Sequence, residues 1–280
     1  MKKTRPVHTP PPVSSITQRH KDVAIDLEKA LHREPIADRG ISVVIPVRNR
    51  AGSLESLVTA ISQKLEQTSR GHELIVVDDG STDDTSAIAE QMASSNRRVR
   101  VVRHDRPEGF GSALRRGFML AKYPLVLQVD DGHDDIGDID RLLEGIDHVD
   151  VVCGVRRRVP QGWSRLSYWL YRRCGQLIFG VRVRDVDCGF RLFRRAALRR
   201  IPIQSISRFA NVEILAKATF MNMLIGEAPL ADVPTPANPS SGFEDTTGDL
   251  CKDAVRLFRR PQFRTSSSSD ALPESTTNAA

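Results

Sequence analysis

The chain has 280 residues, of which 40% are hydrophobic and 27% are charged, and these values are close to those of ordinary globular domains. A wholly disordered or fibrous protein is therefore excluded. No stretch approaches the roughly 18 consecutive apolar residues of a membrane-spanning helix, and residues 1–5 lead into prolines instead of an apolar signal core. We expect neither a secreted nor a membrane-spanning protein.

The formal net charge of +6 favours anionic partners such as nucleotides or phospholipid surfaces. The arginine pairs are dispersed and no nucleic-acid-binding module surrounds them, so nucleic acid is not an expected partner. The four cysteines, Cys153, Cys174, Cys188 and Cys251, show no C-x-x-C spacing. We expect reduced thiols in a cytoplasmic protein, with Cys153 and Cys188 as small buried residues.

The two ends of the chain differ from its middle. Both are polar and lack the apolar surface that would compensate for ordering, so residues 1–24 and 264–280 are interpreted as disordered segments that flank one domain over 25–263. Within that domain, short β-branched runs predict strands at 41–45, 74–77, 99–102, 125–129 and 149–153. Apolar residues at helical spacing separate them, at 54–65, 88–92, 113–121 and 139–146.

This alternation predicts an α/β protein with a doubly wound, mostly parallel sheet and helices on both faces. Ligands of such sheets bind beyond the carboxyl ends of the strands. Asp78 and Asp79 directly follow the second predicted strand. Helix capping explains Ser81 or Thr82 there, whereas two adjacent carboxylates at the end of an apolar strand favour a functional role for Asp78 or Asp79.

A second acidic cluster follows the fourth predicted strand, in Gln128-Val129-Asp130-Asp131-Gly132-His133-Asp134-Asp135. Mg²⁺ takes oxygen ligands, commonly one or two carboxylates together with substrate phosphates. Asp130 and Asp131 are therefore the candidate metal ligands. The alternative is a solvated turn that caps the next helix, which suffices for Asp134 and Asp135.

Five motifs in order carry a family resemblance: PVRN after the first strand, VVDDGSTDDT, RPEGFGSALRRG, QVDDGHDD and DVDCGFRLFRR. Together they resemble the family 2 glycosyltransferases over about residues 40–230, especially the branch of dolichyl- and polyprenyl-phosphate sugar synthases. The resemblance implies the GT-A fold in a single domain, a nucleotide-diphospho-sugar donor, a Mg²⁺ or Mn²⁺ cofactor, and a role in cell envelope biosynthesis. For this branch it also implies inversion at the anomeric carbon.

The resemblance assigns donor-binding roles to residues at the strand ends. The predicted nucleotide-sugar-binding residues are Pro46, Asn49, Asp78, Asp79, Gly109, Gly111, Asp130 and Arg156. Gly109 and Gly111 would let the backbone pass close to the nucleotide. An NAD site is excluded because Leu114 stands where the dinucleotide fingerprint requires its third glycine.

The chain departs from the family at the Asp-x-Asp metal motif, where Gln128 stands in the first position. Asp130, with Asp131, would hold the ion, and Arg156 would add positive charge beside the leaving diphosphate. A GT-A domain that has lost catalysis and serves as a nucleotide-binding or scaffold protein is the alternative. A nucleotidyltransferase ranks third, since PVRNR is not a glycine-rich phosphate loop.

Three carboxylates from the later motifs are candidate bases for a hydroxyl acceptor, namely Asp187, ranked first, Asp185 and Glu213. A lipid phosphate already supplies an anionic nucleophile, and these carboxylates would then position the donor sugar. The run from Cys188 to Phe193 is interpreted as a structural turn. Arg191 within it is predicted to reach a donor or acceptor phosphate, or to pair with Asp185.

An acceptor surface is suggested by residues 163–178, where apolar side chains recur at helical spacing together with both tryptophans and several arginines. Such a helix suits a lipid headgroup layer, although a helix that covers the sheet edge has the same pattern. We expect a lipid-linked acceptor and a cytoplasmic protein in peripheral contact with the inner face of a membrane.

Overall fold

The computed structural model describes residues 35–36, 38–68, 70–130, 136–156, 179–181, 183–231, 242–243 and 247–262. Its strands are β1 (Ile41–Val47), β2 (His72–Asp78), β3 (Val99–Arg103), β4 (Leu125–Val129), β5 (Val151–Val155), β6 (Phe190–Arg194) and β7 (Ile225–Pro229). Its helices are α2 (Leu54–Gln67), α3 (Thr85–Ser95), α4 (Phe110–Leu120), α5 (Ile139–Ile146), α7 (Arg195–Leu198), α8 (Ala210–Phe220) and α9 (Thr247–Arg259), with a short 3₁₀ turn at Ile136–Asp138.

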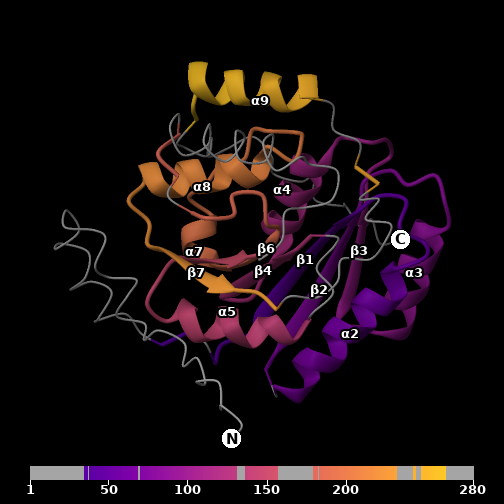
Figure 1. The fold of residues 1–280 in the computed structure, drawn as a ribbon. Coiled ribbons are helices and arrows are strands. Elements are labelled where there is room, and N and C mark those ends of the chain that lie inside the picture. The colour runs from indigo at the N-terminus through magenta and orange to yellow at the C-terminus, as the bar shows by residue number, and fades with distance from the viewer. Residues whose placement is uncertain are drawn as a thin grey trace, which may run out of the picture.

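The described strands form one sheet in the order β3-β2-β1-β4-β6-β5-β7 (Figure 1). Every neighbouring pair is parallel except the two pairs that β6 makes, because β6 runs against both β4 and β5. The predicted doubly wound, mostly parallel sheet is confirmed. Phe190–Arg194, interpreted from the sequence as part of a turn, is instead a strand in the interior of the sheet.

Helices cover both faces of the sheet because alternate strand residues point to opposite sides. Val44 and Val126 pack in one core with α4 and α8, whereas Val43 and Leu127 pack in the other with α2 and α5. In Figure 1, α8 and α9 lie on one side of the sheet and α2 and α5 on the other. Both layers share the same sheet, so the described residues form a single domain.

The central strands are buried along their whole length. All seven residues of β1 and of β2 are buried, as are all five of β4. Such continuously apolar strands are typical of a parallel sheet covered on both faces. The predicted strand at 149–153 lies two residues later, at Val151–Val155, because the Asp150 backbone and side chain instead bind Leu224 and Arg194 at the turn before it.

Candidate active site

The carboxyl ends of β1, β2, β4 and β5 lie at the same edge of the sheet, and β6 begins there because it is reversed. Asp79 follows β2 and Asp130 follows β4, with β1 as the strand between them. Two strand spacings separate the two backbones at this edge, about 10 Å. The carboxylates predicted to share a site are therefore neighbours across one strand.

Asp78 is buried within its own turn. Its carboxylate accepts hydrogen bonds from the Ser81 amide (3.0 Å) and from the hydroxyls of Ser81 and Ser86, and Arg103 Nε lies 3.9 Å away. Ser81 lies in the turn before α3 and Ser86 in its first turn, but the N-cap residue is Asp84 and its side chain makes no capping hydrogen bond, so neither Ser81 nor Thr82 caps this helix. The nucleotide contact proposed for Asp78 stays a prediction.

Asp79 organises the loop that precedes α4. Its buried carboxylate contacts His104 Nδ1 (2.8 Å) and accepts from the amides of Glu108 (2.8 Å) and Gly109 (2.9 Å). A carboxylate that accepts several donors of one loop fixes the shape of that loop. Asp79 therefore shapes the strand-end surface, whether or not it also contacts a nucleoside.

Asn49 joins the loops after β1 and β2. Its backbone has a positive φ of 51°, its amide donates to Ser81 Oγ (2.9 Å), and its Oδ1 accepts from the Thr82 amide (2.9 Å). Asparagine tolerates this left-handed conformation better than most residues. Pro46 is buried in β1 opposite Val77.

Gly109 and Gly111 lie close to another part of the chain. A Cβ on Gly109, whose φ is +96°, would stand 2.4 Å from the Ile206 carbonyl oxygen, and one on Gly111 would stand 2.0 Å from that of Ser205. The Gly111 amide also donates to Ile206 (2.9 Å). The close approach that the two glycines permit is thus to segment 205–206, and their contact with a nucleotide stays a prediction.

Asp130 is 5% exposed and faces a guanidinium. Arg208 Nη1 lies 3.0 Å from Asp130 Oδ2, and Nη2 lies 3.5 Å from Oδ1. The Asp130 amide donates to the Gly189 carbonyl (3.1 Å), and a Cβ on Gly189 would lie 2.0 Å from the Asp130 Cβ. The start of β6 and the end of β4 are therefore in direct contact at this carboxylate.

Gln128 points to the same face of β4 as Asp130 but is fully buried under α8. Its Nε2 donates to Asn211 Oδ1 (2.9 Å), and no described residue donates to its Oε1. Asn211 Nδ2 lies 3.5 Å from the Asp187 carbonyl oxygen. The glutamine in the first position of the motif thus connects β4 to α8 and is not directed to the strand-end surface.

The structure contradicts the prediction that Arg191 reaches a phosphate or pairs with Asp185. Arg191 is fully buried, and its Nη1 and Nη2 donate to the main-chain carbonyls of Asn211 (2.8 Å) and Val186 (2.7 Å). It does not pair with Asp185, which has another partner. A guanidinium that is enclosed by main-chain acceptors supports the start of β6 and presents no surface to a phosphate.

The partner of Asp185 is Arg156, which follows β5. Arg156 Nε and Nη2 donate to the two oxygens of Asp185 at 2.8 and 2.9 Å. Burial opposes the charge of Arg156, but the hydrogen bonds and negative charge of Asp185 outweigh it and raise the pKa of Arg156. This bidentate pair occupies Asp185, so Asp185 is better suited to positioning Arg156 than to accepting a proton.

Asp187 differs from the other two candidate bases. Its side chain is 15% exposed, and Arg156 Nη2 lies 3.9 Å from its Oδ2. Burial raises the pKa of Asp187 and the neighbouring Asp185 adds to this effect, while Arg156 and Arg208 oppose it. A carboxylate with a raised pKa at a strand-end surface has the character of a general base.

The structure also contradicts the prediction that Glu213 is a candidate base. The residue is fully buried in α8, where it accepts from the amides of Gln204 (2.9 Å) and Ser205 (2.7 Å) and from Lys217 Nζ (2.6 Å). These partners are two main-chain amides and a buried lysine of the same helix. Glu213 therefore holds segment 204–205 in place and is not exposed to a substrate.

Among the described carboxylates at this edge of the sheet, Asp130 is the one that belongs to the acidic motif and is the candidate ligand for a divalent ion. The described residues contain no group of three or more histidine, cysteine or acidic side chains placed to hold a metal. Asp131 and residues 157–178 lie outside the described residues. Since Mg²⁺ and Mn²⁺ also take substrate phosphate oxygens, Asp130 fits a site completed by the donor.

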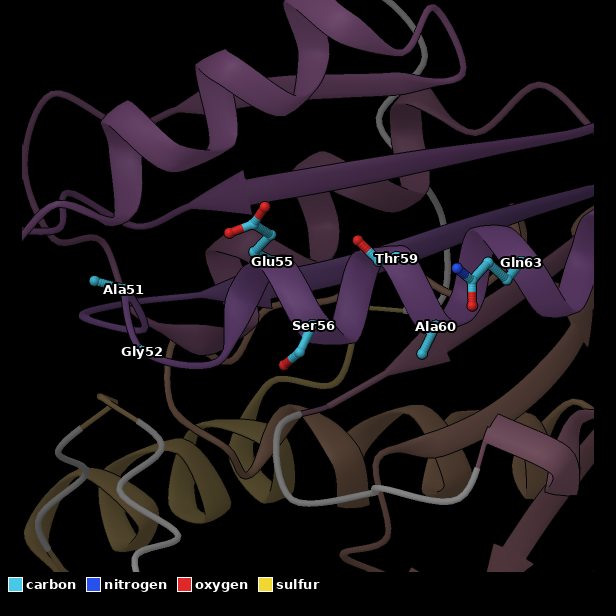
Figure 2. A pocket seen from close by; sticks show the side chains of 7 residues that line it. All are labelled: Ala51, Gly52, Glu55, Ser56, Thr59, Ala60 and Gln63. Atoms are coloured by element: carbon cyan, nitrogen blue, oxygen red, sulfur yellow. The ribbon is translucent and has the colours of Figure 1, made fainter.

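Two other features complete the description of the molecule. Burial raises the pKa of the Cys153 and Cys188 thiols to about 12, so both are unreactive buried residues, as expected. A shallow groove lies along the outer side of α2, lined by exposed polar residues such as Glu55, Thr59 and Gln63 (Figure 2). None of the residues predicted for the site lines this groove.

Arg208 and Asn211 are the residues that sequence reasoning missed. Arg208 resembles the other dispersed arginines in the sequence, and its partner Asp130 is 78 positions away. Asn211 precedes Glu213 on the same helix, and a polar residue beside the apolar run Val212, Ile214 and Leu215 was the available signal. None of the helices in the described part of the chain is long and apolar enough to span a bilayer.

An open sheet with one reversed strand, whose carboxylates gather where the parallel strands end, is the architecture expected for a GT-A glycosyltransferase domain. The sequence model of glycosyl transferase family 2 matches residues 42–202, more than half of the chain, and the chain belongs to this family. Both expectations from the motifs are thereby confirmed.

Named relatives agree with this assignment. The chain is 29% identical over 221 residues to dolichyl-phosphate beta-glucosyltransferase of Saccharomyces cerevisiae, covering 68% of this chain and 66% of the relative. It is 30% identical over 179 residues to polyprenol monophosphomannose synthase of Mycolicibacterium smegmatis, covering 59% and 65%. Each match thus spans slightly less than two thirds of the relative's length.

The fold is also that of a solved structure. Glucosyl-3-phosphoglycerate synthase from Mycobacterium tuberculosis in complex with phosphoglyceric acid superposes with a TM-score of 0.58 at 26% identity, covering 76% of each chain. Its complex with Mn²⁺, uridine diphosphate and phosphoglyceric acid gives a TM-score of 0.63 at 23% identity, covering 84% of this chain and 82% of that one.

Proposed function

We propose that this chain transfers a sugar from a nucleotide-diphospho-sugar to a polyprenyl-phosphate or related lipid acceptor. One observation carries the proposal. Three strands of a family 2 chain bring Asp130, Arg156 and Asp187 to one edge of the sheet, which supplies a carboxylate for a cation, a positive charge and a base of raised pKa.

The donor half of the site is formed by the ends of β1, β2 and β4. The loops that Asn49 and Asp79 organise would surround the nucleoside, in keeping with ligand binding outside the carboxyl ends of parallel strands. Asp130, with Asp131, would hold Mg²⁺ or Mn²⁺. When bound, such an ion neutralises charge on the leaving diphosphate.

The acceptor half would be formed by the segment before β6. Arg156 adds positive charge beside Asp187, and Asp185 fixes the orientation of that guanidinium. For a hydroxyl acceptor, Asp187 would take the proton. For a phosphate acceptor, which is already anionic, Asp187 would instead position the donor sugar.

Two observations favour a lipid acceptor. The two curated relatives cited above are named for dolichyl and polyprenol substrates. The basic amphipathic stretch at 163–178, which lies outside the described residues, has the composition of a helix at a lipid headgroup layer. Peripheral contact with the cytoplasmic face of a membrane is part of this proposal.

The experiment is a donor and acceptor panel with the full chain. UDP- and GDP-sugars are supplied with Mg²⁺ or Mn²⁺ and with polyprenyl phosphate, 3-phosphoglycerate or no acceptor, and nucleotide release and the glycosylated product are measured. We expect product with polyprenyl phosphate, and loss of product in Asp130→Asn.

Product formed only with 3-phosphoglycerate would refute the lipid acceptor and keep the enzyme. Nucleotide binding without turnover across the whole panel would instead favour the scaffold alternative. Equal turnover by Asp130→Asn and the native chain would remove the proposed metal ligand.

A further inference from the structure

The guanidinium of Arg208 covers the carboxylate of Asp130. Its two contacts, one of 3.0 Å and a longer one of 3.5 Å, reach both oxygens of the carboxylate, and the side chains of Arg208 and Asp130 are 22% and 6% exposed. The guanidinium carbon also lies 5.1 Å from the centre of the Phe110 ring, within the range of a cation–π contact. Arg208 is therefore held in a defined place and is not a solvated surface arginine.

The main chain before Arg208 is fixed by two buried carboxylates. Glu213 accepts from the amides of Gln204 and Ser205. Asp253 of α9 accepts from the amides of Ile206 and Ser207, both at 3.0 Å. An anchored backbone reduces the entropy that a long side chain loses when it forms an ion pair, so the contact of Arg208 with Asp130 belongs to the folded architecture.

An ion pair of this kind has a consequence for the cation site. Asp130 is the described carboxylate that fits the ion, and Arg208 lies against both of its oxygens. A carboxylate has acceptor sites for both a divalent cation and a guanidinium, but a guanidinium that already contacts both oxygens competes with the cation and repels it at close range. Arg208 in its present position therefore opposes binding of the cation.

We propose that Arg208 is the counter-ion of Asp130 in the donor-free protein, and that a divalent cation competes with it for this carboxylate as the donor complex forms. The inference rests on the proposed cation role of Asp130 but not on sugar transfer. Arg208 is thus a positioning residue that weakens binding of the cation alone. Once displaced, its charge is available to the phosphates that arrive with the donor, which links cation binding to donor binding.

The test is a Mn²⁺ titration of the full chain without nucleotide, with free Mn²⁺ measured by electron paramagnetic resonance. We expect Arg208→Gln to bind Mn²⁺ about tenfold more tightly than the native chain, since removing a competing charge-assisted pair is worth on the order of 1.4 kcal/mol. Arg208→Lys, which keeps the charge but not the two-pronged contact, should lie between them. Exposed Arg97→Gln is the matched control for net charge and should bind as the native chain does.

A second pair of variants locates the effect. Asp130→Asn in the Arg208→Gln background should abolish the gained affinity if Asp130 is the ligand. Unchanged or weaker Mn²⁺ binding by Arg208→Gln, an equal gain in Arg97→Gln, or no Mn²⁺ binding by any variant overturns the inference. A gain in Arg208→Gln together with failure of every acceptor would refute the transferase proposal and leave the Arg208 inference standing.

Discussion

The carboxylate of Asp187 lies 3.9 Å from Nη2 of Arg156, whose shorter contacts are used by Asp185. Asp187 is therefore close to a positive charge but does not form a hydrogen bond with it. The net effect of its surroundings is still a raised pKa, because burial outweighs the attraction of the arginines. This combination makes Asp187 the carboxylate to test first.

We predict that Asp187→Asn reduces transfer to a hydroxyl acceptor about 10²–10⁴-fold, the usual contribution of a general base. In the native chain the rate should fall on the acidic side, as the pH drops through the raised pKa of Asp187 and the base becomes protonated. That acidic limb should vanish in the variant. Measurement of kcat against pH for both proteins decides this, and an unchanged acidic limb would contradict the role.

The same substitution has an opposite effect on stability. A carboxyl whose pKa is raised on folding binds more protons in the folded state, so its contribution falls as the pH rises from its unfolded pKa towards the folded value. Asp187→Asn removes this loss. We expect its free energy of unfolding to exceed that of the native chain at pH 7 and to converge with it at acidic pH, as measured by urea denaturation.

Glu213→Gln tests the structural assignment of a residue first considered as a base. The substitution leaves Lys217 without its buried anion, and breaking such a pair costs about 3–5 kcal/mol. Turnover per folded molecule should stay within about threefold of the native value, far less than the loss of a general base. Glu144→Gln, on the exposed face of α5, is the control and should change stability by less than about 0.5 kcal/mol.

Gly189→Ala should disturb the end of β4. The new Cβ would lie 2.0 Å from the Asp130 Cβ, so the two strands must separate locally at a cost of about 1–3 kcal/mol. Gly52→Ala, with no neighbour within 4 Å, provides the matched control and should change stability by less than about 1 kcal/mol. Thermal unfolding and Mn²⁺ affinity should both worsen in Gly189→Ala; equal behaviour of the two variants would show that Asp130 tolerates displacement.

Gln128→Asp restores the family's Asp-x-Asp pattern but should not improve cation binding. Gln128 is fully buried and its amide holds Asn211, so an aspartate there places a charge opposite a carbonyl oxygen at a cost of about 3 kcal/mol. Gln63→Asp on the exposed face of α2 is the control. Tighter Mn²⁺ binding in Gln128→Asp would mean that position 128 does reach the cation.

Sequence patterns predicted those elements whose residues are adjacent in the chain. The buried strands β1, β2 and β4 were found from their apolar runs, and the carboxylates at their ends follow from the geometry of a parallel sheet. β6 was missed because Phe190–Arg194 carries two arginines among its five residues and so lacks the continuous apolar run of the other interior strands. The burial of Arg191 depends on carbonyls of Val186 and Asn211 that only the folded chain brings together.

Contacts between distant residues were equally beyond local patterns. Asp130 and Arg208 are 78 positions apart, and the sequence offers many arginines of the same kind. The interpretation of Glu213 as a base was wrong because its partners Gln204, Ser205 and Lys217 are revealed by folding alone. The domain limits and the helix at 163–178 remain predictions.

The direction of β6 has an evolutionary consequence. Because β6 is reversed, the stretch that leads into β6 lies at the same edge of the sheet as the loops that leave β1 and β2. Insertions or exchanges in that stretch can reshape one side of the strand-end site while the strands that frame the other side keep their hydrogen bonds. A family built in this way can diversify its acceptors by loop replacement without redesigning how the activated sugar is held.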